Sequence, residues 1–335
     1  MNPPPKSPTR MMTGRPCRLV TTTPVQRVGA LRVAGRLALL STLLLGFALV
    51  SACKTSEDAT AAASQLSKTA KDLSSYYGAI RTALKNTGDL SELQNVLYGT
   101  PLDDQQIKEA GEEIEKRARM AKSLEELAEA FSNLTDSKAA EDDADAANKL
   151  GQELVSIKAL PDGPPIPEAR GAAAREAMTL IQEHKEKQAA AVLEQILAGL
   201  SDMFAREKPA YESIYKNYVS HAQSIASDMV RKRQVDTSGF LAPALEPFNL
   251  TPQIEEGPST AALDQYALKQ IGNQSAALNA AQQKASDAMD EALKEMTKRL
   301  HQLATEKTLG VRGAPITLDD VEQWLSKVAA SSDED

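Results

Sequence analysis

Cys53 has the most distinctive chemical surroundings of any residue in this 335-residue chain. It directly follows residues 37–52, an uncharged run rich in Leu and Ala that ends in Ser51 and Ala52. Arg36 precedes the run, and the whole segment before Cys53 contains basic residues but no acidic ones. A basic stretch, an apolar run and small residues in that order are typical of an export signal with a cleavage site.

The tetrapeptide Val50, Ser51, Ala52 and Cys53 resembles the lipobox of bacterial lipoproteins, in which an aliphatic and two small residues precede a cysteine. The resemblance implies that the Cys53 thiol is acylated and that cleavage between Ala52 and Cys53 removes residues 1–52. Acylated Cys53 would then tether the protein to a lipid bilayer. Lys54 is not the Asp that favours inner-membrane retention in better-known Gram-negative families, so the resemblance favours the outer membrane.

Two other interpretations of this segment stay open. The first is an uncleaved transmembrane helix, but the 16 uncharged residues between Arg36 and Cys53 fall short of the roughly 20 needed to span a bilayer. The second is an ordinary secretory signal, for which the cysteine directly after the small residues would be a coincidence.

Composition excludes several classes of function. The chain has 38 basic and 46 acidic side chains, and removal of residues 1–52, with seven basic and no acidic residues, leaves 31 and 46, a net charge of −15. Such a charge repels phosphate backbones, so nucleic acid is not expected as a partner. The second cysteine, Cys17, lies in the segment to be removed, and Cys53 is expected to be acylated. A mature protein would then have no free thiol for a disulfide, a thiolate metal site or a cysteine nucleophile.

Apolar residues recur at spacings of three and four over most of the chain, as in Leu66, Ala70, Leu73, Tyr77 and Ile80. The stretches with this pattern are 66–84, 90–97, 107–131, 150–160, 178–229, 268–303 and 317–328. No useful run of alternating apolar and polar residues occurs. The sequence therefore predicts an all-α fold, an elongated bundle of four to six long helices without significant β-sheet.

We expect three consecutive regions: a signal peptide (1–52), the lipidated cysteine with a short polar tether (53–64), and a helical-bundle body (65–335). The Pro-rich segment 161–167 is the strongest candidate for a subdomain break. Two weaker breaks are expected. Residues 86–89 are a candidate helix end, and Pro209 should kink or split its helix because proline lacks the amide donor of a helix interior.

No catalytic motif is recognisable, and no cofactor or metal is expected. His184, His221 and His301 lie on separate stretches and are expected to be half-exposed helix residues. The acidic cluster 141–145 lacks the glycine and alternating ligands of a calcium loop. The basic run 231–233 is expected to close a helix, where positive charge interacts well with the dipole. On the charged face of the stretch 107–131, Glu112, Glu113, Lys116 and Arg117 are expected to face solvent.

Three tyrosines, Tyr211, Tyr215 and Tyr218, follow Pro209 within two helical turns. Tyr211 and Tyr218 fall on the apolar stripe, so core packing with the hydroxyl reaching an edge is expected. A surface that contacts a small molecule or glycan is the alternative.

The connector 240–250 is unusually apolar for a loop, with Phe240, Leu241, Phe248 and Leu250 among its residues. We expect it to fold over one end of the bundle and fill the core. The alternative is a hydrophobic lip at which these four residues contact a partner or a membrane.

Taken by exclusion, these features favour a non-enzymatic, lipid-anchored envelope protein that acts as a helical scaffold or protein-interaction module. Its expected partners are the bilayer, through acylated Cys53, and another envelope protein. One alternative is a membrane-active bundle that inserts a hairpin, for which Ala189–Phe204 is the best segment although it carries Glu194 and Asp202. Another is a periplasmic ligand-binding or enzymatic domain whose site is assembled from dispersed residues.

Overall fold

The computed structural model describes residues 31–99, 104–132, 149–158, 160, 176, 177, 179, 180, 186–241, 245, 247, 258–305 and 315–330. The chain divides into two compact units, Met1–Val50 and Ser51–Asp335. In the first unit, residues 31–50 are helical. The second unit contains the hydrophobic core, and its side-chain packing is described from Asp58 onward.

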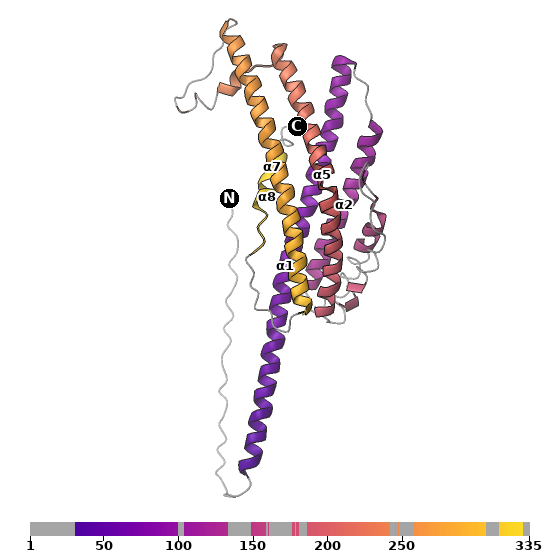
Figure 1. The fold of residues 1–335 in the computed structure, drawn as a ribbon, viewed down its shortest axis with the longest axis vertical. Helices are drawn as coiled ribbons and strands as arrows, with labels where there is room; N and C mark the ends of the chain where they lie inside the picture. The colour runs from indigo at the N-terminus through magenta and orange to yellow at the C-terminus, as the bar shows by residue number, and fades with distance from the viewer. Residues whose placement is uncertain are drawn as a thin grey trace, which may run out of the picture. The chain divides into compact units, whose positions relative to one another are not determined.

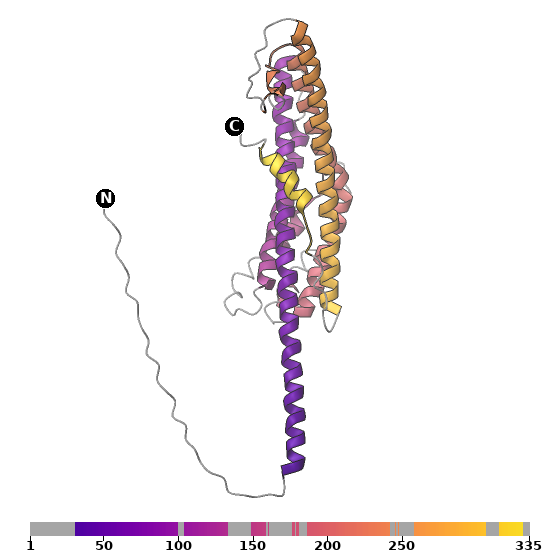
Figure 2. The ribbon, with the colours of Figure 1, turned by 90° about the vertical axis from the view of Figure 1, so that its left-hand side faces the viewer.

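The described elements are all helical, and this part of the chain contains no strand, which confirms the all-α prediction. Figures 1 and 2 show α5 and α7 side by side in the bundle, with α8 against α7. Residues 149–156 form a further short helix. The other elements are α1 (Leu31–Tyr98), α2 (Asp104–Ser132), α5 (Glu186–Arg231), the 3₁₀ turn η1 (Ser238–Leu241), α7 (Pro258–Thr305) and α8 (Asp319–Ala330).

None of the helices described combines the length and the apolar character needed to cross a membrane.

The apolar seam of α1 is buried as the heptad spacing predicts, with Leu66, Leu73 and Ile80 at most 1% exposed. The seam starts earlier than expected. Ala59 and Ala63 are also buried, and residues 54–63 belong to α1 and do not form an extended tether. The spacing of four and three from Ala59 to Leu66 continues the same face of the helix, which explains why this segment packs.

Residues 86–89 do not end α1, which continues to Tyr98. The hydroxyls of Thr87 and Ser91 donate to the carbonyls of Ala83 and Thr87, one turn earlier, at 2.9 and 2.8 Å. Bonds of this kind satisfy the polar side chains inside a helix, so they do not act as caps. A Cβ on Gly88 would lie 3.7 Å from the side chain of Ile107, so this part of α1 packs against α2.

Pro209 lies inside α5, which remains one helix from Glu186 to Arg231 and is not split. Proline removes the amide donor that would reach the carbonyl of Ala205, one turn earlier. Both Ala205 and Pro209 lie on the exposed face of the helix, so water can solvate that carbonyl. The helix therefore tolerates the proline.

Helix α5 ends at Arg231, the first residue of the basic run that was predicted to close it. The backbone N–H of Gln234 donates to Met229 O at 2.9 Å, and that of Arg233 donates to Val230 O at 3.0 Å. Arg233 has a φ of 53°, in the left-handed region. These two bonds and this φ are the features of a Schellman C-cap, and the nearby positive charges interact well with the carbonyl end of the helix.

The bundle core is richer in aromatic contacts than its 4% aromatic composition suggests. Tyr76 packs against Phe204 and Trp324, with ring centroids 5.4 and 5.1 Å apart, and Tyr77 packs 5.6 Å from Tyr211. These rings come from α1, α5 and α8. We call these five residues the aromatic cluster. It joins helices that are far apart in sequence.

Candidate functional site

The predicted site residues lie in different parts of the molecule. Cys53 belongs to α1, but its side chain is not among those that the structure describes. Phe240 and Leu241 lie in η1 and are half-buried. Phe248 and Leu250 fall outside the described residues.

Phe240 packs against a small second core at the junction of α5 and α7, formed by Val230, Ala267 and Ile271. Nearby, Thr237 is 5% exposed and its hydroxyl donates to Asp264 at 3.2 Å. This placement favours the core-filling interpretation for Phe240. The alternative role of the connector as a partner-contacting lip stays a prediction.

The other candidates for chemistry are spread along the bundle. His221 bonds within its own helix to Asn217 O at 2.8 Å, and His301 contacts Glu194 at 3.0 Å across α7 and α5. His184 and the acidic cluster 141–145 lie outside the described residues. Among the residues that are described, no three His, Cys, Asp or Glu side chains could hold a metal ion together.

The tyrosines after Pro209 pack in or against the core, as predicted for Tyr211 and Tyr218, but the Tyr211 hydroxyl does not reach an edge. Tyr211 and Tyr215 are at most 2% exposed, while Tyr218 is half-buried. The Tyr211 hydroxyl donates to the carboxylate of Glu207, one turn earlier. Burial raises the pKa of the Tyr211 phenol well above its usual range, so this hydroxyl stays protonated as a donor.

Arg117 of α2 forms a buried ion pair with Glu207 of α5, which the sequence analysis missed. Both side chains are at most 1% exposed. Arg117 Nε and Nη2 donate to the two carboxylate oxygens of Glu207 at 2.8 and 2.5 Å, a bidentate contact. The expectation that Arg117 lies on a solvated face is therefore wrong.

The same guanidinium also holds the segment after residue 149 against the bundle. Arg117 Nη2 donates to Lys158 O at 2.9 Å, while the Lys158 N–H donates to Glu113 at 2.8 Å. Glu113 is itself only 8% exposed, contrary to expectation, and it pairs with Lys116 at 2.5 Å. Both main-chain polar groups of one residue are thus satisfied by two side chains of α2.

A second buried polar group joins α1 to α7. The hydroxyls of Tyr76 and Ser286 lie 2.6 Å apart, and Gln282 donates to both at 3.1 and 2.9 Å. Burial raises the pKa of Tyr76, so its hydroxyl stays neutral. Within each of these two buried groups, the one around Arg117 and the one around Tyr76, the polar side chains bond to one another inside the core. Such mutual bonding suits a structural role.

Asp72 of α1 is a less well-satisfied buried group. It is 9% exposed, and within the described residues its Oδ2 has no hydrogen-bond partner. Burial raises the pKa of this carboxyl, with a further increase from Glu322 of α8 and Glu125 of α2, against the opposing effect of Lys68 and Lys71. Because its pKa is higher in the folded state, this carboxyl stabilises the folded protein most when it is protonated. That stabilisation is lost as the pH rises through the folded-state pKa.

We expect Asp72→Asn to raise the melting temperature at pH 7, because it removes a poorly solvated charge from the folded state. The gain should shrink as the pH falls toward the unfolded-state pKa, about 4, where the native carboxyl is also neutral. Thermal melts at pH 7 and at about pH 3.5 measure the difference. Asp89→Asn, at an exposed position of the same helix, is the matched control. An equal gain at both pH values would contradict the electrostatic cause.

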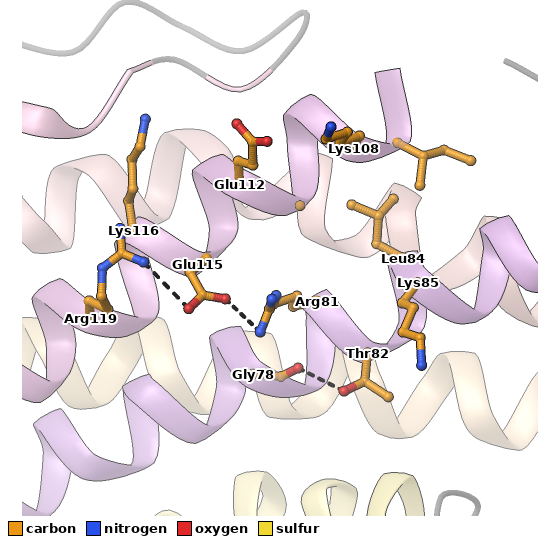
Figure 3. A pocket seen from close by; sticks show the side chains of 12 residues that line it. Gly78, Arg81, Thr82, Leu84, Lys85, Lys108, Glu112, Glu115, Lys116 and Arg119 are labelled. Atoms are coloured by element: carbon orange, nitrogen blue, oxygen red, sulfur yellow. Dashed lines mark hydrogen bonds and ion pairs between the residues drawn. The ribbon is translucent and has the colours of Figure 1, made fainter. Parts of the chain in front are cut away.

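A groove of about 900 Å³ lies between α1 and α2 (Figure 3). Its apolar lining includes Leu84 of α1 and Ile107 of α2. Gly78 and Gly111 also line it, and a Cβ at Gly78 would meet nothing within 4 Å. The groove is therefore open down to the backbone at Gly78, while the Leu84 side chain lies 3.8 Å from the place of a Cβ on Gly111.

The rest of the groove is lined mainly by charge. Five cationic side chains take part (Arg81, Lys85, Lys108, Lys116 and Arg119), but only two carboxylates, Glu112 and Glu115. This excess is opposite in sign to the net charge of the chain, −8. By its own lining the groove is therefore cationic, although Glu113 and Glu153, which lie outside the lining, pair with Lys116 and Arg119 at 2.5 and 3.0 Å.

Figure 3 shows that the two ends of the groove differ in their charged residues. Glu115 lies between Arg81 and Arg119 and pairs with them at 2.5 and 3.4 Å. Lys85 and Lys108 lie at the other end, and neither forms an ion pair with another described residue. This end of the groove therefore carries two exposed lysines.

No protein-family model, curated protein or solved structure matches this chain. The fold and the site define an all-α helical bundle with a buried ionic core and an open cationic groove.

Proposed function

We propose that this chain is a non-enzymatic, lipid-anchored protein of the bacterial envelope that serves as a helical scaffold for protein contacts. The observation that carries the proposal is the continuity of α1. This helix contains Cys53 and runs unbroken into the core, where Ala59 is already buried. An acylated Cys53 would therefore connect to the bundle through one helix rather than through a flexible tether.

The buried polar groups support the non-enzymatic part of the proposal. Arg117, Glu207 and Tyr211 are inside the core and bond to one another, so a substrate cannot reach them without opening the bundle. The α1–α2 groove supports the role in protein contacts, because it is open to solvent and lined by both apolar and charged groups. The resemblance of residues 50–53 to a lipobox supports the anchor, and Lys54 supports the outer membrane as its location.

The test of the anchor is Cys53→Ser in the full chain, followed by metabolic labelling with radioactive palmitate. We expect labelling to disappear and the uncleaved precursor to accumulate, because serine lacks the thiol that receives the diacylglyceryl group. Two or three acyl chains at ~0.8 kcal/mol per buried CH₂ would hold the native protein firmly in the bilayer. Cys17→Ser is the matched control and should label normally. Continued labelling of the Cys53 variant would refute the lipid anchor.

A further inference from the structure

We propose that the α1–α2 groove binds an amphipathic helix of a partner protein that carries carboxylates along the edge facing α1. This inference rests on the proposed role in protein contacts and names the chemistry of the partner. The lining residues of α2 run from Ile107 to Arg119, about 18 Å at a rise of about 1.5 Å per residue. A groove of this length between two helices can seat about three turns of a third helix, with apolar residues against Leu84 and Ile107.

The rim charges specify the partner further. On α1 the rim residues Arg81 and Lys85 are four apart and both cationic. On α2 the residues Lys108, Glu112 and Lys116 are also four apart and alternate in sign. A complementary helix therefore has Glu or Asp along the edge next to α1 and mixed charges along the edge next to α2, as in the flanking positions of coiled coils.

Charge also argues against the other occupants. A second copy of this chain docked groove to groove would bring Arg81 and Lys85 against the same two residues or against the mixed α2 rim, and neither is a continuous acidic edge. A bilayer surface is disfavoured by distance. Arg81 lies 28 residues beyond Cys53 in the same helix, about 42 Å along its axis.

The experiment places a photo-crosslinking amino acid, p-benzoylphenylalanine, at Lys108 of the full chain in its native host. A second strain carries it at Lys298, an exposed position of α7. We expect crosslinking at Lys108 and not at Lys298. The crosslinked peptide, sequenced by mass spectrometry, should have apolar residues at spacings of three and four with Glu or Asp beside them.

Charge reversal tests whether the rim recognises that peptide. Arg81→Glu with Lys85→Glu should reduce the crosslink yield at Lys108 about tenfold, because like charges would then face each other across the interface. Lys294→Glu with Lys298→Glu, a cationic pair of the same spacing on α7, should leave the yield within about twofold. Arg81 pairs with Glu115, so Lys85→Glu alone is included as a variant that breaks no described ion pair, and a smaller loss is expected from it.

An adduct with lipid, glycan or a second copy of the chain would overturn the proposal. A protein adduct without an acidic edge, no adduct above the Lys298 strain, or a yield insensitive to charge reversal would do so as well. The outcome is independent of the anchor test. Loss of the crosslink with normal palmitate labelling refutes only the groove, and a retained crosslink without labelling refutes only the anchor.

Discussion

Replacing Arg117 by Ala should destabilise the bundle by about 3–5 kcal/mol, because it leaves the Glu207 carboxylate buried without its cation. The loss extends beyond the ion pair. The Lys158 carbonyl also loses its donor, and a buried polar group without a partner is costly. Urea unfolding followed by circular dichroism measures the change in the free energy of unfolding.

Two further variants separate the cause from a general effect of mutation. Arg119→Ala removes a neighbouring arginine whose side chain is 48% exposed, and it should cost no more than about 1 kcal/mol. A triple variant with Arg117→Met, Glu207→Leu and Tyr211→Phe removes the charges together with the hydroxyl that donates to them. We expect it to be more stable than Arg117→Ala, because it removes both charges of the pair and leaves neither one buried without its partner. A loss below about 1 kcal/mol in Arg117→Ala would show that Glu207 is not held as an ion in the core.

The helical core could be predicted from sequence because apolar spacing directly reports which face of a helix is buried. Leu66, Leu73 and Ile80 illustrate this, and the predicted stretch 317–328 contains Val321 and Trp324, which are also fully buried. The rule failed at the start of α1, where the buried residues are alanines. Ala59 and Ala63 give a weak hydrophobic signal, although their spacing continues the seam.

The buried ion pair was missed because charged residues were assigned to the solvent face by type. The spacing alone contains the missing signal. Ala110, Ile114, Arg117, Ala121 and Leu124 are separated by four, three, four and three residues, so Arg117 occupies a core position of a heptad pattern. On α5, Glu207 stands in the same way between Leu200, Phe204 and Tyr211, at spacings of four, three and four. Two opposite charges at core positions of two helices predict a buried pair.

The groove could not be predicted in the same way. Its shape depends on how α1 and α2 are offset along their axes, which brings Lys85 and Lys108 to the same end. The spacing of residues within one helix does not report how that helix is offset from another. Exposed lysines and arginines also occur over the whole surface of such a bundle, so only their placement around Leu84 and Ile107 distinguishes these.

Trp324→Ala should undock α8 from the bundle and lower the melting temperature clearly. Trp324 is fully buried, and its ring lies 5.1 Å from Tyr76 of α1 and 5.5 Å from Tyr215 of α5. Loss of a buried Trp side chain typically costs about 3–5 kcal/mol. The helix has 12 residues, and an isolated helix of that length is marginal in water, so α8 depends on docking to stay folded. The Lys68–Glu322 ion pair cannot hold it, because both side chains are more than half exposed.

Hydrogen exchange read out by mass spectrometry distinguishes undocking of α8 from weakening of the whole bundle. In Trp324→Ala we expect the amides of α8 to lose most of their protection, while those in the middle of α7 stay protected below the melting temperature. Gln323→Ala, at the adjacent exposed position, should exchange like the native protein. Trp324→Phe should restore part of the protection, because a smaller ring still fills some of the space beside Tyr76 and Tyr215. Unchanged protection of α8 in Trp324→Ala would mean that Val321 and the other contacts of the helix suffice to dock it.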